Sequence, residues 1–157
     1  MNTENQKFKE TEIGLIPSDW EVRKLGEISE VKTGPFGSAL HQKDYVQDGT
    51  PIITVEHLGE KGVVHLNLPM VSEEDRIRLI SYSLKTGDIV FSRVGSVDRN
   101  SLIKDSENGW LFSGRLLRIR HKANEVNPQF LSFYFHQEST KQRVRAVSVG
   151  QTMASLN

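Results

Sequence analysis

Short apolar and alternating runs, separated by turn residues, recur along this chain and predict a structure built mainly from β-strands. Strands are expected over residues 28–33, 52–55, 62–64, 88–93, 101–104 and 110–121. The pair Ser113-Gly114 divides the last of them into two pieces. In the second piece, Leu117 and Ile119 alternate with Arg118 and Arg120. A period of two predicts that the apolar pair faces the core and the arginine pair forms a cationic, solvent-exposed face.

Helical spacing appears in two segments. Residues 72–80 are expected to form a short helix with Ser72 as its N-cap. Its inward face is expected to consist of Ile77, Leu79 and Ile80. A second helix is expected from Pro128, capped by Asn127. Its core-facing stripe is expected to consist of Phe130, Leu131, Tyr134 and Phe135. These patterns predict an α+β fold: a curved, mostly antiparallel β-structure with short helices and a C-terminal helical segment.

Length and composition fit one globular domain. The chain has 157 residues, of which 36% are hydrophobic and 25% charged, and domains of this kind cluster at about 100–150 residues. Residues 1–13 are polar and are expected to be a flexible lead-in, followed by a single domain over residues 14–157 in which Trp20 anchors the core. No apolar run approaches the roughly 18 residues that cross a bilayer. Because the chain also has no cysteine, a cytoplasmic protein without a membrane partner is expected.

The net charge of zero conceals a strong asymmetry along the chain. Residues 1–75 contain 7 Lys and Arg against 14 Asp and Glu, whereas residues 76–157 contain 13 against 6. The first part therefore carries a charge of −7 and the second +7. A polyanionic partner is expected to meet the second part. Alternatively, folding interleaves the two sets so that they cancel locally.

The segment LKTGDIVFSRVGSVDR, residues 84–99, combines a turn, a strand and a loop of small residues between arginines. Arg93 and Arg99 bracket Gly95 and Ser96, where the backbone can approach a partner closely. Arginine can clamp a phosphate or bridge guanine O6 and N7, and the adjacent Asn100 can read adenine. The competing interpretation is structural: the two arginines could form ion pairs with carboxylates of their neighbourhood, namely Asp88, Asp98 or Glu107.

Several motifs occur in a recognisable order along the chain. They are GLIPSDWEVRKLGEI (14–28), TGPFGSAL (33–40), GTPII (49–53), the arginine segment (84–99), SGRLLRIR (113–120) and GQTMASLN (150–157). In this order they resemble a single target recognition domain of the specificity subunit of type I restriction-modification systems. In that family a long helix follows the last motif, and a second recognition domain follows the helix. The resemblance therefore implies that this chain corresponds to the first recognition domain alone.

The resemblance implies sequence-specific binding to one half of a bipartite site in double-stranded DNA. The expected DNA contacts are Lys32, Phe36, Ser38, Arg93, Ser96, Arg99, Asn100, Arg115, Arg118 and Gln151. Two of these have structural alternatives, because Phe36 could instead fill the core and Gly150, beside Gln151, could instead end a helix. The family implies methyltransferase subunits and a restriction subunit as partners, which use S-adenosylmethionine, ATP and Mg²⁺, so no cofactor is expected here. Asp98 replaces a glycine common in the family. It could orient Arg99, accept from a cytosine amino group, or repel phosphate.

Catalytic interpretations have weaker support in the sequence. Asp19, Glu30 and Lys32 imitate the D…ExK spacing of Mg²⁺-dependent nucleases, but such a trio arises readily by chance. The five histidines are not spaced as zinc ligands, and the chain has no Asn-Pro-Pro-Tyr or Asp-Pro-Pro-Tyr run of an amino-methyltransferase. A non-enzymatic role is therefore expected. Two alternatives stay open: a DNA-recognition domain of a single-chain restriction-methyltransferase, and a protein-interaction module.

Overall fold

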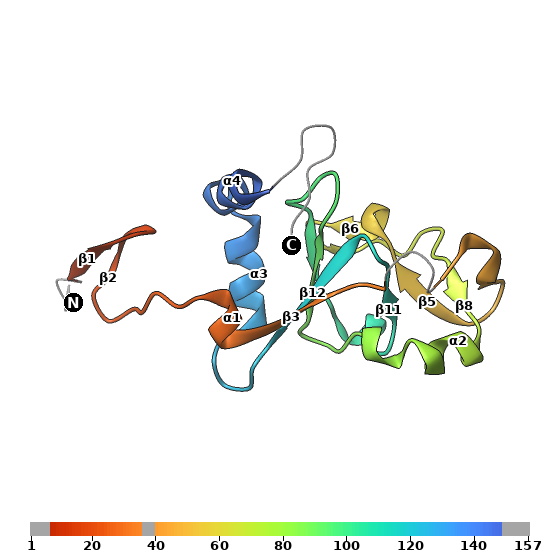
Figure 1. Ribbon diagram of the computed structural model, residues 1–157. Coiled ribbons are helices and arrows are strands. Elements are labelled where there is room, and N and C mark those ends of the chain that lie inside the picture. Colours follow the sequence, from red (N-terminus) through yellow and green to blue (C-terminus); the bar gives the residue numbers. More distant parts are fainter. Residues whose placement is uncertain (1–6, 36–39, 149–157) are drawn as a thin grey trace.

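The computed structural model describes residues 7–35 and 40–148, whose strands form two four-stranded sheets and two two-stranded pairs (Figure 1). The strands are β1 (Phe8–Thr11), β2 (Gly14–Pro17), β3 (Ser29–Thr33), β4 (Tyr45–Val46), β5 (Thr50–Ile53), β6 (Leu58–Gly59), β7 (Gly62–Val63), β8 (Met70–Val71), β9 (Ile89–Ser92), β10 (Asn100–Leu102), β11 (Leu111–Phe112) and β12 (Leu116–His121). The α-helices are α1 (Leu25–Ile28), α2 (Glu73–Arg78), α3 (Pro128–His136) and α4 (Glu138–Val147). Short 3₁₀ turns are η1 (Gln42–Asp44), η2 (Val55–His57), η3 (Ile80–Tyr82) and η4 (Asp105–Glu107).

The first sheet has the strand order β10-β9-β12-β3, and every neighbouring pair in it is antiparallel. Strands β9 and β12 are its two central strands, and all four residues of β9 are buried. Ile89 and Phe91 pack against Leu131 and Phe135 of α3, with the two phenylalanine rings edge to face at 4.8 Å. Val90 points to the opposite face, which is also covered. A strand buried on both faces has a continuous apolar sequence, as Ile-Val-Phe has here.

The second sheet has the order β11-β5-β8-β4, with β11 and β5 parallel and the other pairs antiparallel. Its core joins that of the first sheet, since Ile53 and Phe112 pack with Val90 and Leu116. The turn over residues 113–115 connects β11 to β12 and so joins the two sheets at one edge. This mixed architecture confirms the expected α+β class with a mostly antiparallel β-structure and few helices.

Both predicted helix starts are confirmed by their caps. The Ser72 hydroxyl accepts a hydrogen bond from the Asp75 amide at 3.2 Å, and the Asn127 side chain accepts from two amides of the first turn of α3. A cap of this kind depends on neighbouring residues only, which is why the sequence reveals it. The inward face of the first helix was predicted wrongly, because Leu79 is buried whereas Ile77 and Ile80 are 59% and 52% exposed.

The cationic face predicted for β12 is not solvent-exposed. Arg118 is 3% exposed, and its guanidinium donates to the carbonyl oxygens of Ser81 and Ser83 and to Glu30. Arg120 donates to both carboxylate oxygens of buried Asp88. The alternation itself is present, but residues 81–83 cover the polar face. A period of two distinguishes the faces of a strand without showing what lies on either of them.

A flexible lead-in is expected over residues 1–13, and the described part of this segment includes a strand. Strands β1 and β2 form an antiparallel hairpin, with Phe8 opposite Pro17, that stands apart from the two sheets (Figure 1). Trp20, which follows this hairpin, is not a core anchor. It is 49% exposed and packs edge-on against Phe130 of α3, with 5.9 Å between the ring centroids.

Candidate functional site

A groove of about 660 Å³ opens where three loops meet. One loop connects β9 to β10, the second connects β11 to β12, and the third is the η2 turn that follows β5. The groove is lined by Arg93 and Arg99 from the first loop, Arg115 from the second and Glu56 from the third. Because three arginines and one glutamate line it, this concave surface carries a net positive charge.

The two arginines of the β9–β10 loop are anchored to backbone carbonyls. Arg93 Nη1 donates to the carbonyl oxygen of Gly114 at 3.0 Å, and Arg99 Nη2 donates to that of Leu58 at 2.9 Å. Each anchor holds one edge of the guanidinium, which fixes the direction of the side chain. A positioned arginine loses less conformational entropy when it binds a ligand than a freely rotating one.

The competing interpretation expected Arg93 and Arg99 to form ion pairs with Asp88, Asp98 or Glu107, but these three carboxylates have other partners. Asp88 pairs with Arg120, Asp98 with Arg145, and Glu107 with His65. Each of these carboxylates therefore has a partner outside the β9–β10 loop.

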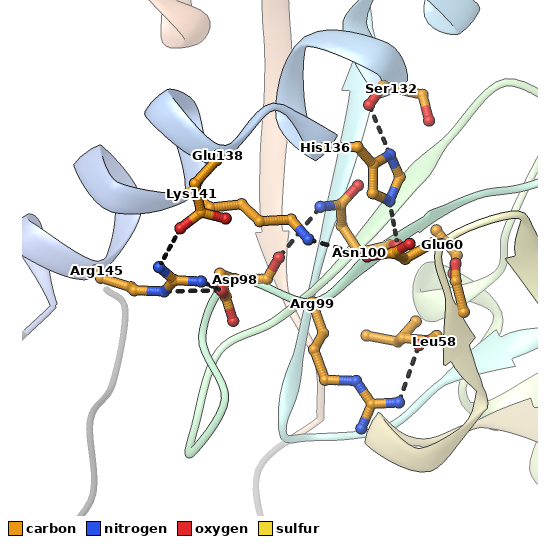
Figure 2. A network of polar contacts seen from close by, with 12 residues as sticks. Leu58, Glu60, Asp98, Arg99, Asn100, Ser132, His136, Glu138, Lys141 and Arg145 are labelled. Atoms are coloured by element: carbon orange, nitrogen blue, oxygen red, sulfur yellow. Dashed lines mark hydrogen bonds and ion pairs between the residues drawn. The ribbon is translucent and has the colours of Figure 1, made fainter.

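The β9–β10 loop is braced from within and from α4. Val97 is 3% exposed and fixes the loop to the core, and the Arg99 amide donates to the Ser96 carbonyl at 3.3 Å. Gly95 has a φ of +82° at the tip, a conformation that favours glycine. Asp98 accepts hydrogen bonds from Arg145 of α4, so it ties the loop to the C-terminal helix (Figure 2). The carboxylate of Asp98 therefore contacts Arg145 of α4 and does not orient Arg99.

The structure brings together Arg93, Arg99 and Arg115, three of the expected DNA contacts, and leaves a fourth, Ser96, exposed at the loop tip. Arg115 is exposed and makes no side-chain hydrogen bond or ion pair with any other described residue. Two other predicted contacts are interior. Asn100 is 2% exposed and Arg118 is 3% exposed, so neither can meet a ligand at this surface.

Lys32 lies outside the groove, with its ammonium 4.9 Å from the centre of the Tyr82 ring. Together with the Glu30–Arg118 contact of 3.2 Å, this assigns structural partners to two members of the nuclease-like trio. The remaining predicted contacts, Phe36, Ser38 and Gln151, lie outside the described residues.

Sequence reasoning missed three polar residues of the groove, which come from β4 and from η2 with its N-cap. They are Tyr45, Thr54 and Glu56. Burial raises the pKa of Tyr45, so its hydroxyl is a neutral donor at physiological pH. The parallel pairing of β5 with β11 brings Thr54 and Glu56 to the groove that Arg115 also lines. That pairing joins positions about 60 residues apart in sequence, and no local sequence pattern predicts it.

The groove offers arginine donors to an anionic or acceptor-rich ligand, which suits phosphates and guanine edges. Within the described ranges there is no group of three or more His, Cys, Asp or Glu side chains arranged to hold a metal ion. No helix in this part of the chain is long and apolar enough to cross a bilayer.

Comparison with known proteins identifies the class that this fold and groove define. The model of the type I restriction modification DNA specificity domain matches residues 17–157, so the chain belongs to this family. It is 32% identical over 158 residues to the MjaX specificity subunit of Methanocaldococcus jannaschii, an alignment that covers 94% of this chain and 36% of that subunit.

Solved structures agree with the fold. The HsdS subunit from Thermoanaerobacter tengcongensis superposes with a TM-score of 0.61 at 13% identity, covering 95% of this chain and 35% of that one. The S subunit from M. genitalium gives a TM-score of 0.55 at 12% identity, with coverages of 86% and 30%. The chain therefore spans about a third of the length of these relatives.

Proposed function

We propose that this domain binds double-stranded DNA sequence-specifically and recognises one half of a bipartite target. The observation that carries the proposal is the groove in which Arg93, Arg99 and Arg115 converge from two separate loops. Convergent arginines supply both the phosphate contacts that position a duplex and the donors that read base edges. Family membership supports the same role.

The role we propose is non-catalytic and cytoplasmic. Within a longer subunit, the domain directs methyltransferase subunits and a restriction subunit to the target, and these partners carry the chemistry and its cofactors. The curated relatives are named as specificity subunits, which favours this role over a domain of a single-chain restriction-methyltransferase and over a protein-interaction module.

The first test asks whether this chain selects a DNA sequence. Duplexes bound from a randomised pool are expected to become enriched in one short motif. Absence of any enrichment would contradict the proposed function.

Arg115→Ala is expected to weaken binding to selected and scrambled duplexes alike. The side chain of Arg115 is exposed and makes no hydrogen bond to another described residue, so it can contact a phosphate of any DNA sequence. In a plot of log affinity against log salt concentration, the slope should fall by about one unit. Arg78→Ala is the control, because it removes the same charge from an exposed side chain of α2 outside the groove. An unchanged slope in Arg115→Ala, or an equal change in both variants, would exclude a phosphate contact at Arg115.

Arg145→Ala is expected to reduce the preference for the selected motif over a scrambled duplex by about two- to five-fold. The substitution releases Asp98 and loosens the loop that carries both anchored arginines (Figure 2). Arg143→Ala is the matched control on the same helix, since Arg143 donates to Tyr134 and to the Ile13 carbonyl and not to the loop. Equal preferences in the two variants would show that the Asp98 contact does not support recognition.

A further inference from the structure

Glu56 is an acidic group on a surface that otherwise attracts anions. It lines the groove with Arg93, Arg99 and Arg115, is exposed, and forms no ion pair with any described residue. Its carboxylate accepts a hydrogen bond from the Thr54 hydroxyl at 3.1 Å. A carboxylate placed beside a DNA backbone repels phosphates, so it weakens binding that depends on charge alone.

The turn that carries Glu56 is held firmly in place. The neighbouring His57 is 1% exposed, its Nδ1 atom accepts from the Thr54 amide at 3.0 Å, and its Nε2 atom lies 3.0 Å from the Leu66 carbonyl oxygen. Because Nδ1 accepts, Nε2 carries the proton and donates to Leu66. Both sides of the imidazole are therefore used to fix η2.

Arg99 is fixed to the same segment as Glu56. Its anchor is the carbonyl oxygen of Leu58, two residues after Glu56 (Figure 2). One N–H of the guanidinium is used by this anchor, and a guanidinium has five. The segment thus presents a positioned donor group and a carboxylate acceptor within one groove.

This combination matches the edges of guanine and cytosine. In the major groove guanine offers the acceptors O6 and N7, which arginine bridges, and cytosine offers the N4 amino donor, to which a carboxylate is complementary. Phosphates and sugars offer no comparable donor in DNA, so a base amino group is the ligand that uses the Glu56 carboxylate.

We propose that the half-site contains G·C pairs, that Arg99 reads a guanine and that Glu56 accepts from a cytosine amino group. This inference rests on the proposed function, because it assigns a base preference to the same groove. Glu56 also acts by exclusion, since its charge penalises complexes in which a phosphate or a base acceptor faces it.

The test is selection from a randomised duplex pool by the 157-residue chain and its Glu56→Gln variant. The wild type should prefer cytosine at one position by about ten-fold. In Glu56→Gln the preference at that position should move from cytosine to adenine, because a glutamine amide matches adenine N6 and N7. Arg99→Ala should abolish the preference for guanine at a second or paired position while leaving the other positions selected.

Glu60→Gln is the matched control. Glu60 is an exposed carboxylate four residues away, which contacts Lys141 of α4 and does not line the groove. It removes the same charge and should leave the motif unchanged. Thermal unfolding of both glutamine variants should match the wild type, because both side chains are exposed.

The selection experiment distinguishes failure of the proposed function from failure of the base preference inferred here. A wild-type chain that enriches no motif overturns the proposed function and this inference with it. A wild-type motif that Glu56→Gln leaves unaltered, or that loses preference only at A·T pairs, overturns the inference alone. So does a Glu56→Gln variant that binds all duplexes more tightly with an unchanged motif, which would show that the carboxylate faces the backbone.

Discussion

Replacing Asp88 by alanine should lower the free energy of unfolding by about 3 kcal/mol. Asp88 is 2% exposed and accepts hydrogen bonds from the Lys85 amide at 2.8 Å and from Arg120 Nε and Nη2 at 2.9 and 2.8 Å. The substitution removes the partner and leaves a partly buried guanidinium uncompensated. An unpaired interior charge costs far more than the pair contributes when complete.

The neighbouring Arg118 makes this position more sensitive. Burial lowers the pKa of Arg118, and the adjacent charge of Arg120 lowers that pKa further, whereas Asp88 and Glu30 oppose both effects. The hydrogen bond that Arg120 donates to Asp88 is the main cause of the raised pKa of Arg120. Asp88 therefore offsets the charges of two arginines of the first sheet beneath residues 81–83. Its loss leaves two like charges close together.

Urea unfolding measures the effect, with Glu73→Ala as the control. Glu73 also pairs with an arginine, Arg76, but its side chain is 67% exposed on α2, where an ion pair contributes little. Asp88→Asn should fall between Asp88→Ala and the wild type, because an amide still accepts from the Lys85 amide. Should Asp88→Ala shift the unfolding midpoint no more than Glu73→Ala does, the buried pair does not support the fold.

Local patterns predicted local structure well. The strand at residues 89–92, the break at residues 113–114 and the caps at Ser72 and Asn127 each depend on residues close in sequence, and the structure confirms them. The surroundings of β12 were predicted wrongly because residues 81–83, some 35 positions away, accept hydrogen bonds from Arg118. The same segment supplies an acceptor for Arg120, the carbonyl oxygen of Ser83. Hydrophobic alternation carries no information about such distant partners.

The candidate site divides in the same way. Arg93, Arg99 and Arg115 were predicted from their place in short loops, and they share the groove. Asn100 was predicted from its neighbour Arg99, but it is the first residue of β10 and points inward. Glu56 was missed because contacts between residues far apart in sequence bring its turn to the arginines, namely the pairing of β5 with β11 and the hydrogen bond from Arg99 to Leu58. The sequence motifs identified the arginines of the groove, whereas Glu56 could be found only from the tertiary structure.

Gly34→Ala should destabilise the protein by about 2 kcal/mol and also reduce its DNA preference. A Cβ atom at Gly34 would lie 2.0 Å from the Ser113 carbonyl oxygen, far inside van der Waals contact. The end of β3 and the β11–β12 turn would have to separate. That turn carries Arg115, and the Gly114 carbonyl anchors Arg93, so the displacement reaches two of the groove's three arginines.

Gly26→Ala provides the comparison, because no heavy atom lies within 4 Å of its added Cβ. This variant should unfold at the wild-type midpoint or slightly above it, since alanine favours helix over glycine. Thermal unfolding and selection from the randomised duplex pool are measured on both variants. A Gly34→Ala protein with the wild-type midpoint would show that the end of β3 does not approach the β11–β12 turn as closely as the structure has it. A reduced midpoint with an unaltered motif would show that the contact between Gly34 and Ser113 supports the fold but does not position Arg93 and Arg115. The contacts of Val97 and Asp98 in the β9–β10 loop would then be what positions the groove.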